Sequence, residues 1–295
     1  MENQENEKVN PLNSKAVLVR FSTTMFSGKV LDRTATQAVS TQYNLTSDTG
    51  HYLKYTVPKE SLQGIQAVLS FARFRVHYKY TLPWNNDGLR ILSLKLYDEH
   101  MKEMKEQESL FFSEVEKFIN EYPAHIDQAK IKLGNLFNES DYPAIEQIRK
   151  MFTFGLEVEK IPAGEDFRVD LADSEVERIS AEINTRAEER VNGAVKVAYQ
   201  KLYDVVSHMA DTLSDPKAKF KNTLTGNLDE LLAVLPALNL THDVNLERLY
   251  LEVKNKLAGK DPEDLRHNPI TRNTTAKDAQ GIMDQMETFM GKVGE

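Results

Sequence analysis

Residues 71–90, FARFRVHYKYTLPWNNDGLR, interleave basic side chains with aromatic ones. A single acidic residue, Asp87, opposes the positive charge in a chain whose net charge is -8. Groups of this kind can hold a phosphate backbone, stack on a base or bind an acidic protein. The candidate contacts to a nucleic acid or a protein partner are Arg73, Arg75, Tyr78, Lys79, Trp84 and Arg90. The same residues can instead wrap a strand and a turn around a core, and that alternative stays open.

No pattern of catalytic residues accompanies this segment. Ser27-Gly28-Lys29 suggests a phosphate-binding loop, but Thr23 stands where that motif needs glycine and Val30 where it needs serine or threonine. The acidic residues and histidines at helical spacing are typical of a solvated helix face. The sequence therefore predicts no catalytic residue, no metal and no cofactor, and a protein that is not an enzyme.

Composition bounds the class of protein. Of 295 residues, 40% are hydrophobic and 28% are charged, as in ordinary globular proteins. Cysteine is absent, which excludes disulfides and thiolate chemistry and fits a reducing compartment. The polar N-terminus lacks the apolar core of a secretory signal, and no window approaches the roughly 18–20 apolar residues of a membrane helix. We expect a protein of the cytoplasm, or of the host cytoplasm if a phage encodes it, with no membrane contact.

The fold class expected is mainly α with a small α+β N-terminal lobe. A flexible leader, residues 1–15, precedes this lobe, which covers residues 16–88. Residues 16–26 are rich in valine, phenylalanine and threonine and predict a strand, and residues 82–88 (LPWNNDG) have the composition of a turn. The basic and aromatic segment then joins the lobe to the helices that follow. A structural role for it as an elbow is the interpretation we favour over a contact role.

Long helices dominate residues 89–258. The first runs from Leu89 to Tyr122, because apolar residues recur near one helical face. The second begins near Ser174 and covers about forty residues, since its apolar positions recur every three or four residues. Between them, residues 154–170 alternate around a turn and predict a β-hairpin. We expect the two helices to pair as a long antiparallel coiled-coil arm that carries the hairpin near its tip. Pairing with a second copy, as a homo-oligomer, is the alternative.

The C-terminal residues predict a tethered helix. Residues 259–275 are polar and contain two prolines, so we interpret them as a linker. Residues 276–295 predict a last helix with a methionine-rich apolar stripe. The candidate docking residues of this stripe are Ile282, Met283, Met286, Phe289 and Met290. Packing of the stripe on the same chain is favoured, and docking onto another protein is the alternative.

Several short motifs resemble those of a known family. They are FSGK at 26–29, VP at 57–58, AR at 72–73, TLPW at 81–84 and DGLRIL at 87–92. In this pattern the chain resembles the bacterial and phage proteins of the domain of unknown function 3150 family, most clearly over residues 16–122 and more loosely to about 255. That family has no assigned activity, and its genes commonly lie near those of MoxR-type AAA+ ATPases and von Willebrand A proteins. The resemblance implies a protein partner and no catalytic residue.

Three hypotheses of function follow. The first is a non-enzymatic helical adaptor or scaffold, bacterial or phage-encoded, that partners a MoxR-type AAA+ ATPase. The second is a nucleic-acid-binding protein that uses residues 71–90. The third is a phage structural or host-inhibitory protein.

Overall fold

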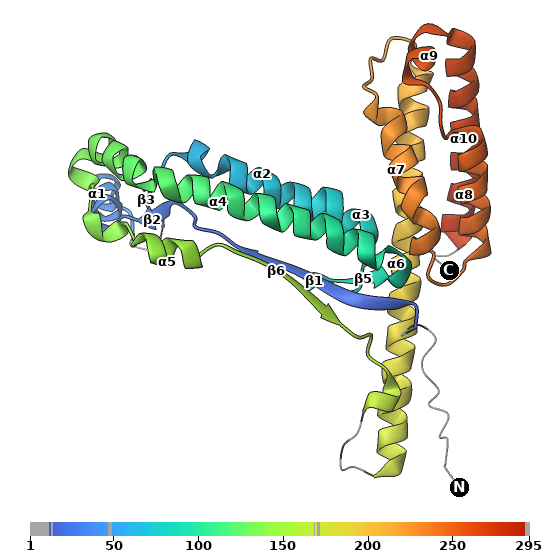
Figure 1. Cartoon of the computed structure of the whole chain (residues 1–295), viewed down its shortest axis with the longest axis horizontal. Helices are drawn as coiled ribbons and strands as arrows, with labels where there is room; N and C mark the ends of the chain where they lie inside the picture. The colour runs from blue at the N-terminus through green and yellow to red at the C-terminus, as the bar shows by residue number, and fades with distance from the viewer. Residues whose placement is uncertain (1–11, 13, 47–48, 168, 170–171, 293–295) are drawn as a thin grey trace. The chain divides into compact units, whose positions relative to one another are not determined.

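The computed structural model describes residues 12, 14–46, 49–167, 169 and 172–292, and of residues 289–292 only the backbone. The chain divides into two compact units. Unit 1 comprises Met1–Arg20, Tyr78–His100 and Val158–Glu295, and unit 2 comprises Phe21–His77 and Met101–Glu157. Figure 1 shows the elements of both units, which are mainly helical with short antiparallel strands. The predicted leader lies mostly outside the described residues, and the other predicted domain boundaries stay predictions.

Unit 1 begins with strands around the predicted turn. β4 (Thr81–Pro83) pairs antiparallel with β5 (Leu89–Ser93), and β5 pairs antiparallel with β1 (Ala16–Thr24). Ile91 lies opposite Leu18 on one side and Leu82 on the other, and all three are buried. The prediction of a helix from Leu89 is therefore wrong at its start. Backbone partners on both sides draw this apolar run into the sheet, and the helix begins only at Tyr97.

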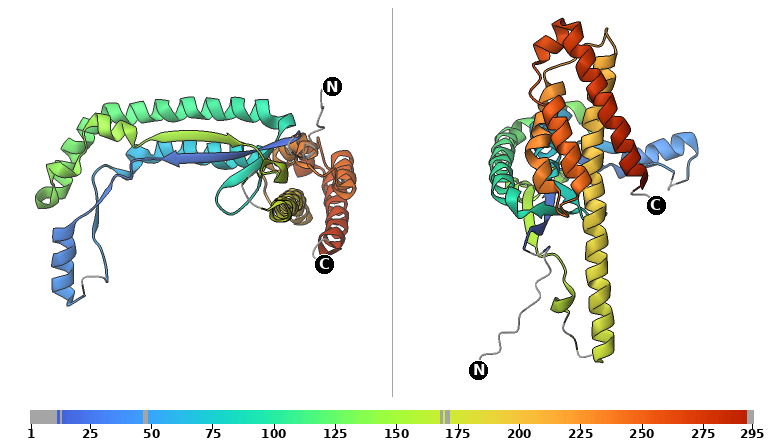
Figure 2. Two further views of the ribbon diagram at one scale, coloured as in Figure 1. Left: turned by 90° about the horizontal axis from the view of Figure 1, so that it is seen from below. Right: turned by 90° about the vertical axis from the view of Figure 1, so that its right-hand side faces the viewer.

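The C-terminal part of unit 1 is a group of helices. They are α6 (Asp173–Ser214), α7 (Thr223–Leu238), α8 (Val244–Lys256), α9 (Pro262–His267) and α10 (Pro269–Lys292). α6 has 42 residues, which confirms the predicted long helix. It packs along α10 and α7 and buries Val195, Leu202 and Met209 (Figures 1 and 2).

The partner of α6 differs from the one expected. Its long neighbour within unit 1 is α10, whereas the predicted partner, now α4 (Tyr97–Leu133), buries its apolar face within unit 2. The coiled-coil arm is therefore not confirmed. A helix of this length needs a long apolar partner, and the C-terminal residues supply one in the same unit.

Residues 259–275 are not an extended linker. Asp261 caps α9 by accepting a hydrogen bond from the Glu263 amide at 2.9 Å, and Pro262 follows in the first turn. Asn268 similarly accepts from the Ile270 amide at 3.1 Å, next to the first residue of α10. Proline is favoured at a first helical position, so these two prolines begin helices where the sequence pattern suggested a break.

Unit 2 is built around α4, which packs with α2 (Gln63–Phe71) and α5 (Ile145–Lys150). The core of the unit is rich in aromatic residues, and its largest fully buried members are Phe111, Phe118, Tyr122, Ile65 and Ile148. α4 continues through Pro123, so the expected end at Tyr122 is wrong. Its buried side reaches past the proline to Ala129, and that packing offsets the hydrogen bond that proline removes.

The helix after α2 changes its winding. Residues Ala72–His77 form a π-helical stretch, followed by the single turn α3 (Tyr78–Tyr80) of unit 1. Such stretches are rare and occur mostly as local widenings of an α-helix, often at functional sites. This one coincides with the first half of the basic and aromatic segment.

The predicted hairpin at 154–170 is not confirmed. β6 (Thr153–Glu159) takes its place beside β1 in the sheet order β4-β5-β1-β6, and the hydroxyls of Thr24 and Thr153 lie 2.8 Å apart. Gly164–Asp166 then form a 3-10 turn. Residues 168 and 170 of the predicted second strand lie outside the described residues. The alternating pattern was therefore correct for one strand, whose partner lies far earlier in the sequence.

A small module completes unit 2. β2 (Lys29–Leu31) leads into α1 (Arg33–Tyr43), and the chain returns through β3 (Leu53–Tyr55), which pairs antiparallel with β2. α1 buries none of its own residues, and Figure 2 shows it extending away from the α2 and α4 pair. Among the described residues, no helix is long and apolar enough to cross a membrane.

Candidate functional site

The six side chains predicted as contacts fall in both units. Arg73 and Arg75 belong to unit 2, whereas Tyr78, Lys79, Trp84 and Arg90 belong to unit 1. Their surroundings within each unit decide which of them remain exposed.

Trp84 and Arg90 are engaged within unit 1. Trp84 is 4% exposed, and the Arg190 guanidinium lies 5.5 Å from the centre of its ring. Arg90 donates from Nε to the Thr81 hydroxyl at 2.6 Å and from Nη2 to the Thr81 carbonyl at 2.9 Å. Its guanidinium also lies 4.1 Å from the centre of the Tyr78 ring. Burial lowers the pKa of Arg90 to about 10. These contacts fasten β5 to β4 and leave the two side chains little surface to offer a partner.

Lys79 is likewise directed at its own unit. Its ammonium donates to the Tyr80 hydroxyl at 2.9 Å and lies 4.5 Å from the centre of that ring. Tyr80 is completely buried and meets the His100 ring edge-on at 5.9 Å. Lys79 therefore covers a core residue.

Arg90, Tyr78 and Thr81 form a cluster that also includes Lys201 of α6, a residue that the sequence did not single out. Its ammonium donates to the carbonyl of Tyr78 and, at 3.4 Å, to that of Thr81. Burial, helped by the charge of Arg90, lowers the pKa of Lys201 to about 8. The cluster is thus a clamp between α6 and the β4 region, made by two cations that share neutral acceptors. A lysine next to the apolar seam of a long helix was the available signal.

The first half of the segment is more open. Arg73 donates to the Thr23 hydroxyl at 3.4 Å and lies 5.7 Å from the centre of the Phe21 ring, so it faces its own unit. The exposed side chains of the stretch are Phe71, Phe74 and Arg75. Of the six predicted contacts, only Arg75 is therefore exposed, and it lies on the π-helical stretch with Phe74, next to Phe71 at the end of α2.

The C-terminal stripe faces its own unit. Ile282 and Met286 are completely buried, and Met283 is nearly so, because α10 packs along α6 and α8. The side chains of Phe289 and Met290 lie outside the described residues.

An exposed sheet face in unit 2 offers a better candidate. In the β2–β3 pair, Lys29 lies opposite Tyr55 and Leu31 lies opposite Leu53. Since alternate residues of a strand point to the same side, these four form one surface, called here the β2–β3 face. Leu31 is 42% exposed, Leu53 54% and Tyr55 39%. Two large aliphatic side chains and one aromatic ring therefore stand together in solvent.

Two ammonium groups flank the ring of that face. The ammonium of Lys29 lies 5.4 Å and that of Lys59 4.8 Å from the centre of the Tyr55 ring. A hydrogen bond from Lys59, with the charges of both lysines, lowers the pKa of the Tyr55 hydroxyl. Within the described part of the chain, neither Lys29 nor Lys59 has a carboxylate within ion-pair distance. The face thus pairs an apolar half with a cationic half.

The opposite side of the same strands is fixed by a buried ammonium. Lys54 Nζ lies 2.7 Å from the carboxylates of both Asp32 and Asp141, and it donates to the Leu136 carbonyl at 2.6 Å. Burial alone would lower the pKa of Lys54, but the two carboxylates outweigh it and raise the value. Asp32 also caps α1 by accepting from the Ala35 amide at 2.8 Å, and its pKa is lowered by that bond and by Lys54. One side chain therefore ties β3 to the start of α1 and to the two turns that follow α4.

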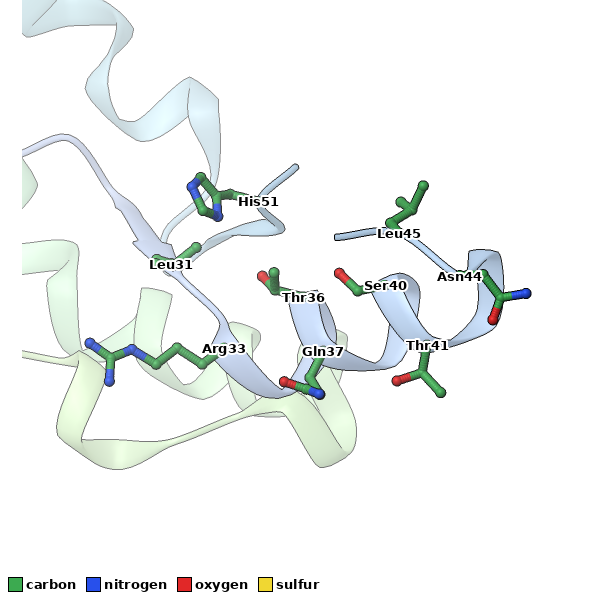
Figure 3. Close-up of a pocket in the computed structure, with 9 residues that line it drawn as sticks. All are labelled: Leu31, Arg33, Thr36, Gln37, Ser40, Thr41, Asn44, Leu45 and His51. Carbon is green, nitrogen blue, oxygen red and sulfur yellow. The ribbon is translucent and has the colours of Figure 1, made fainter. Parts of the chain in front are cut away.

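A pocket adjoins the face at Leu31. Its volume is about 670 Å³, and Figure 3 shows Thr36 and Ser40 of α1 on the side that faces Leu45 and His51. Thr36 links α1 to the returning chain, since its hydroxyl donates to the Asp32 carbonyl at 2.6 Å and accepts from the Tyr52 amide at 3.0 Å. The full lining is Leu31, Arg33, Thr36, Gln37, Ser40, Thr41, Asn44, Leu45 and His51. Hydroxyls and amides dominate it, which suits hydrogen bonding to a peptide more than enclosure of an apolar ligand.

Comparison of the chain with protein-family models, with curated proteins and with solved structures finds no match. The resemblance to the domain of unknown function 3150 family therefore stays a prediction. In the ranges that the structure describes, no three histidine, cysteine, aspartate or glutamate side chains gather in a way that could hold a metal ion.

The sequence alone gave little sign of the β2–β3 face. Lys29 and Tyr55 are far apart along the chain and meet only through the strand register. One signal was available: in Leu53-Lys54-Tyr55 the middle residue differs in character from its neighbours, as expected when it faces the opposite side of a strand.

Proposed function

We propose that this chain is a non-enzymatic adaptor or scaffold that binds another protein through the β2–β3 face. The observation that carries the proposal is the contiguous exposure of Leu31, Leu53 and Tyr55 on a sheet face. Single exposed apolar residues are ordinary on protein surfaces, whereas contiguous ones mark interaction sites.

The backing of the face supports the same function. Because Lys54 fixes the strands from behind, a partner meets side chains whose backbone is already ordered. Preordered surfaces lose less conformational entropy on binding, which favours a specific complex. The α1 pocket extends the contact area beyond the sheet.

The test compares two double variants for capture of a partner. Leu31→Thr with Leu53→Thr removes the aliphatic half of the face and keeps residues with good strand propensity. Val244→Thr with Ile270→Thr is the matched control, since both side chains are exposed apolar residues of unit 1. The tagged full-length chains are purified from the native host, and the partner is then purified and titrated calorimetrically against each variant.

We expect the first variant to lose the partner and the control to retain it. The first purified protein to titrate is the MoxR-type AAA+ ATPase that the family resemblance suggests. Retention of the same partner by both variants, at unchanged affinity, contradicts a role for this face.

Nucleic-acid binding is the second candidate, and the exposed Phe71, Phe74 and Arg75 favour it. Stacking of a base on an accessible ring contributes roughly 1–3 kcal/mol. A salt titration with single-stranded DNA tests it, and Phe71→Ala with Arg75→Ala should abolish salt-sensitive binding. Absence of binding at low salt would remove this candidate.

The third hypothesis, a phage structural or host-inhibitory protein, also stays a proposal. It is tested by the mass of the full-length chain in solution. An obligate multimer supports an assembly role, and a monomer at all concentrations opposes it.

A further inference from the structure

The β2–β3 face has a charge pattern that selects among protein partners. Along each strand, its two members are separated by about 7 Å, the spacing of residues i and i+2. The aliphatic pair Leu31 and Leu53 occupies one position, and the pair Lys29 and Tyr55 occupies the next. A partner must therefore present an apolar group and, about 7 Å away, a group that suits the cations.

Within the described part of unit 2, no carboxylate neutralises the cationic position. The ammonium groups of Lys29 and Lys59 lie 5.4 and 4.8 Å from the centre of the Tyr55 ring. Neither meets a carboxylate among the described residues. Lys54, on the other side of the sheet, already has two carboxylates. The strand pair thus carries Lys54 behind it, with two carboxylates, and Lys29 in front of it. Lys59, from the turn after β3, joins Lys29 at the Tyr55 ring.

Two ammonium groups that meet no carboxylate in the described part of the chain, beside an exposed apolar pair, complement a carboxylate next to an aliphatic side chain. A polynucleotide would satisfy the cations but would leave Leu31 and Leu53 against a polar backbone. An acidic peptide satisfies both halves, and an extended one places residues i and i+2 at the spacing of the face.

We infer that the partner bound at the β2–β3 face is an acidic peptide segment that sets an aliphatic side chain between Leu31 and Leu53 and an aspartate or glutamate against Lys29 and Lys59. This inference rests on the proposed function and specifies the chemistry of its partner.

The test is a peptide selection with charge reversal. A random peptide library is selected on the full-length chain and, in parallel, on the variant with Lys29→Glu and Lys59→Glu. The matched control carries Lys102→Glu and Lys105→Glu, two exposed lysines of α4 in the same unit. Enriched peptides are synthesised, and their dissociation constants are measured by fluorescence anisotropy at low and high salt.

We expect peptides that combine aspartate or glutamate with an aliphatic residue two positions away. Their affinity should fall by about tenfold or more on charge reversal at Lys29 and Lys59, fall with added salt and stay unchanged in the control. The reversed variant should instead enrich basic peptides, and thermal unfolding should show that both variants are folded.

Three outcomes overturn the inference: no enriched peptide, enriched peptides without acidic residues, or equal affinity for the wild-type and reversed faces. If neutral peptides bind and need Leu31 and Leu53, the inference fails while the proposed function stands. If the host partner is kept after Leu31→Thr with Leu53→Thr, the proposed function itself fails.

Discussion

In unit 1, Arg90 and Lys201 lie against the ring or backbone carbonyls of Tyr78 and Thr81, whereas in unit 2 Lys29 and Lys59 lie near a Tyr55 ring that is exposed to solvent. Both clusters combine two cations with tyrosine. The first is buried, so the pKa of Lys201 is lowered to about 8 and that of Arg90 to about 10. The second is open, and there the tyrosine hydroxyl has the lowered pKa.

The difference shows how one residue composition serves two purposes. A cation over a ring contributes packing and hydrogen bonds when its other side is covered, and it offers recognition when that side is open. The dense segment 71–90 mostly takes the first form, and the pair of short strands takes the second. Burial, and not the density of basic and aromatic residues, separates a structural clamp from a contact surface.

The largest expected effect is a loss of stability on removing a buried aromatic ring, compared with removing an exposed one. Trp84→Ala should destabilise the chain by about 3–5 kcal/mol, because it leaves a cavity under Arg190. Phe71→Ala, at a ring that is 52% exposed, should cost less than about 1 kcal/mol. Urea unfolding followed by circular dichroism measures both. Equal losses would show that the two halves of the segment are alike.

The second effect is a pH dependence of folding stability that Lys201 causes. Its pKa is about 8 in the fold and near 10.5 when unfolded, so the unfolded chain binds the proton more tightly between these values. The free energy of unfolding should therefore rise as pH rises from 8 to 10.5, by roughly 3 kcal/mol relative to Lys201→Met. Lys196→Met, at an exposed position of α6, is the control and should keep the rise. A wild-type curve that runs parallel to that of Lys201→Met would refute the buried cation.

The third effect concerns the backing of the open face. Lys54→Met leaves Asp32 and Asp141 facing each other without their shared cation. Hydrogen exchange of the amides in β2 and β3 should accelerate roughly a hundredfold, with little change in the α6 bundle. Lys59→Met should leave exchange unchanged, since it removes a surface cation of the same module. Unaltered protection after Lys54→Met would mean that the strands are held by other contacts.

The smallest effect is on stability at the open face itself. Lys29→Glu with Lys59→Glu should shift the midpoint of thermal unfolding by less than about 2 °C, because exposed charges contribute little to folding. Differential scanning calorimetry measures the shift. A large drop in the unfolding midpoint would show that these two lysines stabilise the fold as Arg90 and Lys201 do, and the contrast between the two clusters would then fail.

Part of the fold follows from sequence patterns alone. The apolar spacing predicted α6 correctly, and residues 84–88 of the predicted turn lie between the paired strands β4 and β5. A helix was predicted for Leu89–Ser93 because a short apolar run fits a helix or a strand equally well. The strand that pairs with this run, β1, lies far earlier in the chain. The predicted partner of α6 was not confirmed because the polar stretch around Pro262 and Pro269 is helical rather than a linker. α10, which begins at Pro269, packs along α6 instead.

The candidate site was less accessible to sequence reasoning than the fold. The interleaved segment stood out by local density, but solvent exposure depends on what packs over it. Lys29, Leu31, Leu53 and Tyr55 form a surface only through the register of two three-residue strands. Short strands carry too little alternation to fix such a register in advance.

The anchor of Lys54 also sets an order of events during synthesis. Its carbonyl acceptor, on Leu136, lies 82 residues further along the chain, and Asp141 is made later still. At roughly 5–20 residues per second, the strands leave the ribosome several seconds before their backing can close. A partner that needs the finished surface can therefore bind the nascent chain only after Asp141 has emerged.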